Sequence, residues 1–175
     1  MFDIWLADYH HASELGFGLI AVRMLGAALL CGAIGFEREL RKNTAGLRTT
    51  ILIGLAAATF ALITLELVAD VSRAGAATDD AVRLDPIRLV EAVTGGVAFL
   101  AAGLIVYARG SVHGLTTGAG MWLAAGIGLA TGLGLWKIAL LSTGGGLVVL
   151  ALLHLVQVKA GLKADAVTLD DRPPD

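Results

Sequence analysis

The segment of residues 35–50 reads GFERELRKNTAGLRTT and is the longest polar run between two long apolar runs. It carries four of the thirteen basic residues of the chain, two acidic residues, an asparagine and threonines. The apolar runs on either side are long enough to cross a bilayer as helices, so the segment is expected to connect two membrane spans. A loop that only fixes topology needs fewer polar side chains than this one has. We therefore expect this loop to be a functional surface of the protein.

The composition is typical of an integral membrane protein. Hydrophobic residues make up 57% and charged residues 16% of the 175 residues, whereas charged residues account for roughly a quarter of a soluble domain. The net charge of −2 is too small to indicate a nucleic-acid partner. The single cysteine, Cys31, excludes a disulfide framework. The acidic N-terminus predicts that no signal peptide is cleaved.

The apolar stretches predict an all-α fold, a polytopic membrane bundle of about five transmembrane helices, since a span needs ~20 apolar residues. The fourth and fifth helices share one long apolar block and are expected to be separated by a tight turn between Gly132 and Lys137. The expected apolar stretches are residues 15–36, 47–69, 85–107 and 115–158.

Basic residues predict the orientation of this bundle, because cytoplasmic loops carry an excess of Lys and Arg. With five spans, the basic side contains the loop at 37–49, the loop at 109–114 and the residues that follow the last span. We expect the C-terminus in the cytoplasm and the N-terminus outside. The transmembrane domain is expected over residues 1–158, with a short polar, disordered tail over 159–175.

Charged residues within the apolar stretches are costly in a membrane, so each needs a partner or a function. At ~1.5 Å per helical residue, five of them reach the outer half of the bundle and form an expected charge network. In one interpretation the network is internally compensated, and Arg23 pairs with Glu91, or in second place with Asp85 or Glu66. In the other, Asp85, Glu91 and Glu66 bind Mg²⁺, which takes carboxylate oxygens and keeps several waters. The network comprises Arg23, Glu66, Asp85, Arg88 and Glu91.

The loop between the first two spans is a second candidate site, on the expected cytoplasmic side. Arg38 and Arg48 flank it, and in one interpretation they bind phospholipid headgroups. In the other they form salt bridges with Glu37 and order the loop as a docking surface for a protein partner. No catalytic or zinc-binding motif is present, so we do not expect an enzyme. The motif residues are Glu37, Arg38, Asn43, Gly46, Arg48 and Thr49.

Glycines recur at helical spacing in the third and fourth spans. Small residues let membrane helices approach closely, because packing drives their association. We expect tight internal packing, and a homo-oligomer interface is the alternative for the stripe on the fourth span. That stripe is Thr116, Gly120, Ala124, Gly128 and Gly132, and the packing residues expected overall are Gly96, Gly103, Gly120, Gly128 and Gly132.

Seven parts of the sequence, at residues 23, 35–39, 45–49, 85–88, 96–103, 114–117 and 122, form a recognisable pattern. Together they resemble the MgtC/SapB family, also called the magnesium transporter-C family, and the resemblance extends from Arg23 to about Leu153. Two positions depart from the family pattern: Ala101 stands where glycine is usual, and Glu91 where an uncharged polar residue is expected. The blocks are Arg23, GFERE at 35–39, AGLRT at 45–49, DPIR at 85–88, GVAFLAAG at 96–103, GLTT at 114–117 and Trp122.

The resemblance implies a multi-pass protein of the bacterial inner membrane that serves magnesium homeostasis, and in pathogens growth at low Mg²⁺ and survival inside host cells. It implies a Mg²⁺ transporter or transport accessory, with Mg²⁺ as the one ion expected and no other cofactor. The alternative is a non-transporting regulator that binds a partner complex, a magnesium P-type ATPase or the F-type ATP synthase, through the loop at 37–49. Longer members carry a cytoplasmic C-terminal domain, and functions ascribed to that domain are not carried over.

Overall fold

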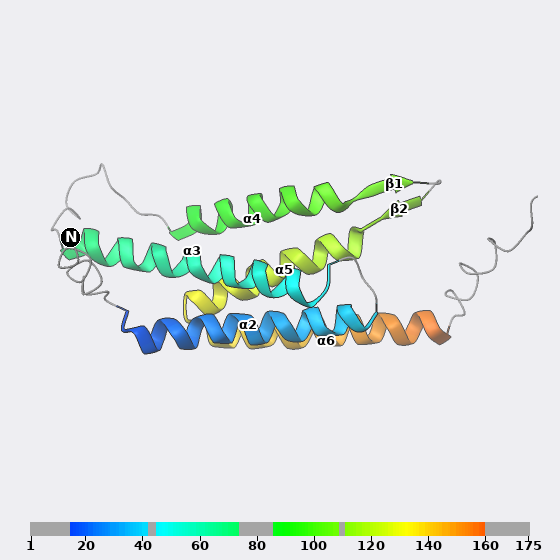
Figure 1. Ribbon diagram of the computed structural model, residues 1–175, viewed down its shortest axis with the longest axis horizontal. Helices are drawn as coiled ribbons and strands as arrows, with labels where there is room; N and C mark the ends of the chain where they lie inside the picture. Colours follow the sequence, from blue (N-terminus) through cyan, green and yellow to red (C-terminus); the bar gives the residue numbers. More distant parts are fainter. Residues whose placement is uncertain (1–14, 42–44, 74–85, 109–110, 160–175) are drawn as a thin grey trace, which may run out of the picture.

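The computed structural model describes residues 15–41, 45–73, 86–108 and 111–159. These residues form five helices and one short β-hairpin. In Figure 1 the helices lie side by side along one axis, and consecutive helices run in opposite directions. The elements are α2 (Phe17–Leu40), α3 (Leu47–Arg73), α4 (Pro86–Leu104), β1 (Val106–Ala108), β2 (Ser111–His113), α5 (Leu115–Gly132) and α6 (Trp136–Lys159).

The two ends of the bundle carry different connections. The end of α2, the start of α3, the hairpin and the end of α6 lie at one end (right in Figure 1). The start of α2, the end of α3, the start of α4 and the turn from α5 to α6 lie at the other. Successive connections therefore alternate between the two ends of the bundle, as the predicted arrangement of five helices requires.

The helix α5 is the centre of the bundle and contacts α2, α3, α4 and α6. Its sequence is apolar or small on all sides, which is typical of a helix that is buried on all sides. A Cβ atom added at Gly128 would lie 2.9 Å from the Cα of Gly54 in α3, and one added at Gly132 would lie 2.7 Å from the carbonyl oxygen of Ala58. The backbones of α3 and α5 therefore touch, and only small residues allow this approach.

The turn from α5 to α6 lies where the sequence predicted it. Gly134 has φ +78°, a left-handed conformation that glycine adopts without strain. Its N–H donates to the carbonyl of Thr131 at 3.0 Å, and the N–H of Leu135 donates to Ala130 at 2.7 Å. These two bonds form a Schellman motif, which satisfies the last carbonyl groups of α5.

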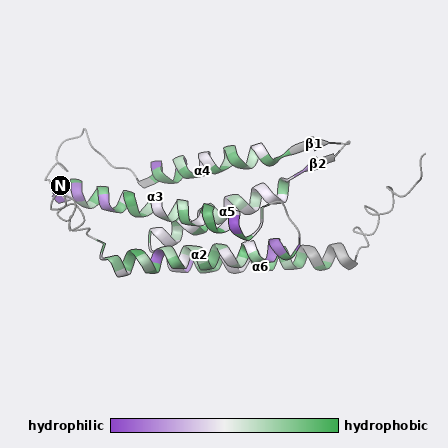
Figure 2. Ribbon diagram, viewed as in Figure 1, coloured by the Kyte–Doolittle hydropathy of each residue, from purple (hydrophilic) through white to green (hydrophobic). Residues whose placement is uncertain are grey.

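Several of the described helices have the length and hydropathy of membrane spans. Three are long and apolar enough to cross a membrane, over Phe17–Leu40, Leu47–Arg73 and Ile87–Leu104, and α6 has a shorter apolar part over Trp136–Leu152. Figure 2 shows hydrophobic residues along most of their lengths and the more hydrophilic ones mainly near helix ends. Large apolar side chains such as Phe17, Leu29 and Phe99 are exposed on the outside of the bundle, as they are in proteins surrounded by lipid. The chain is an α-helical membrane protein.

The hairpin between α4 and α5 differs from the prediction of a span to residue 107 followed by a plain loop. The helix α4 ends at Leu104, and two antiparallel strands follow, with Val106 opposite His113 and Ala108 opposite Ser111. Val and Tyr favour extended structure, and residues 106–107 follow that local preference once the helix has ended. The predicted disordered tail falls almost entirely outside the described residues.

Candidate functional site

Arg38 anchors the candidate site, at the end of the bundle where α2 ends and α3 and α5 begin. The side chain lies in the last turn of α2 and is 1% exposed. Its Nε donates to the carbonyl oxygen of Ala45 at 3.0 Å, and Nη1 to that of Thr116 at 3.1 Å. Nη2 donates to Oγ1 of Thr117 at 2.9 Å. A buried charge is costly without such partners. One guanidinium therefore joins α2, the segment just before α3 and the first turn of α5.

Glycines make room for this arginine and for the turn beside it. A Cβ atom added at Gly120 would lie 3.0 Å from Nη1 and 3.2 Å from Cζ of Arg38. One added at Gly35 would lie 2.8 Å from the Cα of Leu47 and 2.9 Å from the Cβ of Thr50. The last turn of α2 and the first turn of α3 consequently pack backbone against backbone.

Two glutamates flank Arg38 and have different partners. Glu39 Oε2 accepts a hydrogen bond from the N–H of Leu47 at 2.9 Å and so satisfies a free donor at the start of α3. Glu37 forms an ion pair with Arg41, one turn further along α2. Both carboxylate oxygens of Glu37 are buried and accept no hydrogen bond from the described residues. We refer to Glu37, Arg38, Glu39, Arg41 and their partners in α3 and α5 as the arginine-anchored end.

The other residues predicted for this loop are less enclosed. Arg48 is exposed in the first turn of α3, and Thr49 is half-buried. Gly46 is buried, and its carbonyl oxygen accepts a hydrogen bond from Thr50 Oγ1 at 2.8 Å. Asn43 lies outside the described residues. Glu37 pairs with Arg41, because i,i+4 spacing puts these two side chains next to each other. The salt bridges expected from Arg38 and Arg48 to Glu37 stay predictions.

Arg23 lies near the opposite end of the bundle and does not pair with a carboxylate of the described residues. Its Nη1 donates to the carbonyl oxygen of Gly132 at 2.8 Å, and its Nε is buried and donates no hydrogen bond within the described residues. The C-terminus of a helix carries partial negative charge, so the end of α5 replaces the carboxylate of Glu91 that was expected. The turn at 132–134 was visible in the sequence, and its depth matches that of Arg23.

The remaining charged residues of the predicted network do not meet in the described part of the chain. Glu66 is half-buried and accepts a hydrogen bond from the N–H of Leu15 at 3.1 Å. Arg88 and Glu91 are exposed on α4, and Asp85 lies outside the described residues. No group of three His, Cys, Asp or Glu that could hold a metal occurs among the residues described. The Mg²⁺ site at Asp85, Glu91 and Glu66 remains a prediction.

The predicted packing glycines fall into two groups. Gly120, Gly128 and Gly132 lie in close contacts inside the bundle. Gly96 and Gly103 lie on the exposed side of α4, where an added Cβ would meet nothing within 4 Å. These last two positions leave space on the surface rather than closing a contact within the chain.

Comparison with known proteins places this helical region in a known group. A family model described as the MgtC family matches residues 24–159. The chain is 39% identical over 133 residues to "Putative magnesium transporter YhiD" of Escherichia coli (strain K12), a match covering 76% of this chain and 60% of that protein. It is 38% identical over 139 residues to "Protein MgtC" of Brucella abortus (strain 2308), covering 79% and 53%. It is 37% identical over 122 residues to "Protein MgtC" of Salmonella typhimurium, covering 70% and 47%.

The matches cover the bundle and leave much of the relatives unmatched. The chain spans about half to three-fifths of the length of these curated relatives. No solved structure matches it.

Proposed function

The chain belongs to the MgtC family, and on that premise we propose that it serves magnesium homeostasis from within the bacterial inner membrane. The relatives come from bacteria, and the one from Escherichia coli carries magnesium transport in its name. The family match covers residues 24–159, which include the whole of α3, α4, α5 and α6 and residues 24–40 of α2. The function shared with the relatives is therefore assigned to the helical bundle and its loops.

Within this role we assign the action to the arginine-anchored end, as the surface of a transport accessory that contacts a partner membrane complex. The observation that carries the assignment is the burial of Arg38, which uses all of its nitrogens to hold the residues before α3 against α5. A loop that merely connects two spans needs no such anchor. The exposed side chains beside this anchor, Glu39 and Leu40 at the end of α2, are thereby held in one arrangement, which is what recognition of a partner requires.

Direct transport of Mg²⁺ is the second candidate, and Glu37 favours it. Oε1 of Glu37 forms the ion pair with Arg41, whereas Oε2 is buried and accepts no hydrogen bond from the described residues, so Oε2 is left for a cation or its water shell. Mg²⁺ is usually bound through one or two carboxylates and keeps several waters. The predicted site at Asp85, Glu66 and Glu91 would serve the opposite face of the membrane in the same mechanism.

Flux of Mg²⁺ into proteoliposomes separates the two candidates. The accessory role predicts the flux of empty liposomes for the purified wild-type protein, although the same gene supports growth at limiting Mg²⁺ in a strain without its own copy. Flux above that background which Glu37→Gln abolishes and Arg88→Gln leaves intact would establish transport instead. A protein that neither conducts Mg²⁺ nor supports growth would contradict the magnesium role itself.

A further inference from the structure

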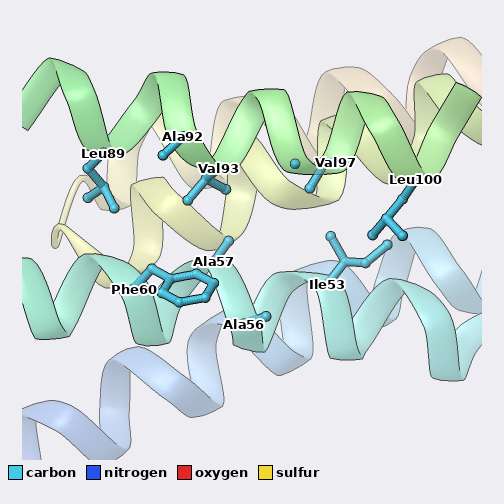
Figure 3. A pocket seen from close by; sticks show the side chains of 10 residues that line it. Ile53, Ala56, Ala57, Phe60, Leu89, Ala92, Val93, Val97 and Leu100 are labelled. Atoms are coloured by element: carbon cyan, nitrogen blue, oxygen red, sulfur yellow. The ribbon is translucent and has the colours of Figure 1, made fainter.

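An apolar groove opens between α3 and α4 on the outside of the bundle. Figure 3 shows Phe60 of α3 and Leu89 and Val93 of α4 lining it, with Val97 and Leu100 further along α4. Its volume is about 440 Å³, and every residue that lines it is apolar or glycine. Phe60 and Leu100 are exposed at its edges, so the groove faces the surroundings of the protein rather than its core.

A second hollow continues this groove toward the start of α3. It has a volume of about 450 Å³ and shares Ile53, Ala56 and Leu100 with the first hollow. Leu104 of α4 and Thr49 of α3 lie among the residues at its far end. From Leu89 to Leu104 the groove extends about 22 Å at the rise of an α-helix. This is most of the ~30 Å thickness of the hydrocarbon core of a bilayer.

A cation lies where the groove reaches the arginine-anchored end. Arg48 is exposed, directly precedes Thr49 and lies one turn before Leu52, which also lines the groove. Residues four apart share a helix face, so Arg48 is on the face of the groove. Among the described residues the recorded ion pairs join Arg41 to Glu37 and Arg73 to Asp70, which leaves the guanidinium of Arg48 available. Guanidinium groups bind phosphate through two parallel hydrogen bonds.

We propose that this groove binds one phospholipid, with an acyl chain lying between α3 and α4 and the phosphate on Arg48. The apolar lining suits a hydrocarbon chain along its whole length, and the charge at its mouth complements the phosphate. A helix of a partner or of a second copy is too large to lie inside it. At a diameter of ~10 Å, a helix of this length fills on the order of 1,500 Å³.

Two glycines on α4 make the groove testable without disturbing the fold. Gly96 and Gly103 line it, and an added Cβ at either would meet nothing within 4 Å. Gly96→Leu and Gly103→Leu therefore fill space that the acyl chain occupies. Gly95→Leu is the matched control, because Gly95 is equally open but is absent from the lining. It adds the same side chain to the same helix.

Native mass spectrometry of the detergent-solubilised protein, with phosphatidylglycerol added, measures the bound lipid. We expect one phospholipid on the wild-type protein and on Gly95→Leu. Gly96→Leu and Gly103→Leu should bind it at least tenfold more weakly, since each methylene kept out of an apolar site costs a factor of about four. Arg48→Gln should also weaken binding and remove its salt dependence, whereas Lys137→Gln, an exposed position on α6 away from the groove, should leave both unchanged. Equal binding by Gly96→Leu and Gly95→Leu would overturn the proposal.

The same spectra test whether a second copy of the chain occupies the groove instead of a lipid. A second copy would give a dimer that Gly96→Leu dissociates, and that result would contradict the lipid assignment. A fluorescent reporter in the groove tests the proposal even if the leucine variants do not fold. Phe60→Trp places an indole in the groove, and brominated phosphatidylglycerol should quench its fluorescence more than brominated diacylglycerol, which lacks the phosphate, at equal content in liposomes. Equal quenching by the two lipids would likewise refute the proposed site.

Discussion

Replacing Arg38 by methionine tests how strongly one buried guanidinium stabilises the arginine-anchored end. Arg38→Met keeps an unbranched side chain of similar length but removes hydrogen bonds to the carbonyl oxygens of Ala45 and Thr116 and to Thr117 Oγ1. Hydrogen bonds from charged groups each contribute about 1.5–3 kcal/mol, and unpaired buried acceptors add their own cost. The desolvation cost of the guanidinium is removed at the same time and offsets part of this loss. We expect a net destabilisation of about 2–4 kcal/mol.

The free energy of unfolding is measured by denaturation in mixed micelles, with circular dichroism following helix content. Arg48→Met is the matched control, because Arg48 is exposed in the first turn of α3 and such substitutions usually change stability by less than about 0.5 kcal/mol. Arg38→Lys should recover only part of the stability, since an ammonium cannot replace a planar group that reaches three partners. If Arg38→Met and Arg48→Met have the same free energy of unfolding, the guanidinium of Arg38 does not anchor this end and the reasoning fails.

Three further predictions follow from the packing and the charges. Gly128→Leu should lower the melting temperature markedly, because an added Cβ would lie 2.9 Å from the Cα of Gly54. Gly126→Leu, at an open position, should leave the melting temperature unchanged. Equal melting temperatures of the two variants would show that α3 and α5 do not pack closely at Gly128. Arg23→Met should lower the free energy of unfolding by about 1–2 kcal/mol, because it removes the cation at the C-terminus of α5. Adding Glu91→Gln should recover none of that loss. Recovery of stability in the double variant would instead support the ion pair between Arg23 and Glu91. A cysteine at Asn43, in a Cys31→Ala background, should react with an impermeant reagent only after the cells are permeabilised, and labelling of intact cells would reverse the orientation.

The helices could be predicted from sequence because their physical cause is local. Apolar runs of spanning length, and the two glycines of the turn at 132–134, determine where helices form and end without reference to the rest of the chain. The central position of α5 was also readable in part, because Gly128 and Gly132 recur at a spacing that suits close helix contact. The hairpin at 106–113 was not predicted, since short strands depend on the end of a preceding helix more than on composition.

Partners of charged residues were harder to predict, because a sequence gives the depth of a side chain but not its neighbours. Arg23 was expected to find a carboxylate, and the structure gives it the carbonyl oxygen of Gly132. Backbone acceptors carry no signal in the sequence unless a helix end is considered as a partner. Arg38 was named as a residue of the candidate loop, but its burial and its bonds to α5 depend on residues about 80 positions away.

Growth at limiting Mg²⁺ tests the central claim most directly, in a bacterial strain that lacks its own MgtC-family protein. The wild-type chain should restore growth, and so should Arg88→Gln, which changes an exposed arginine of α4. Arg38→Met, expressed to the same level in the membrane, should not restore it, because the arginine-anchored end loses its fixed shape. Failure of the wild-type chain to restore growth, or full rescue by Arg38→Met, would contradict the account.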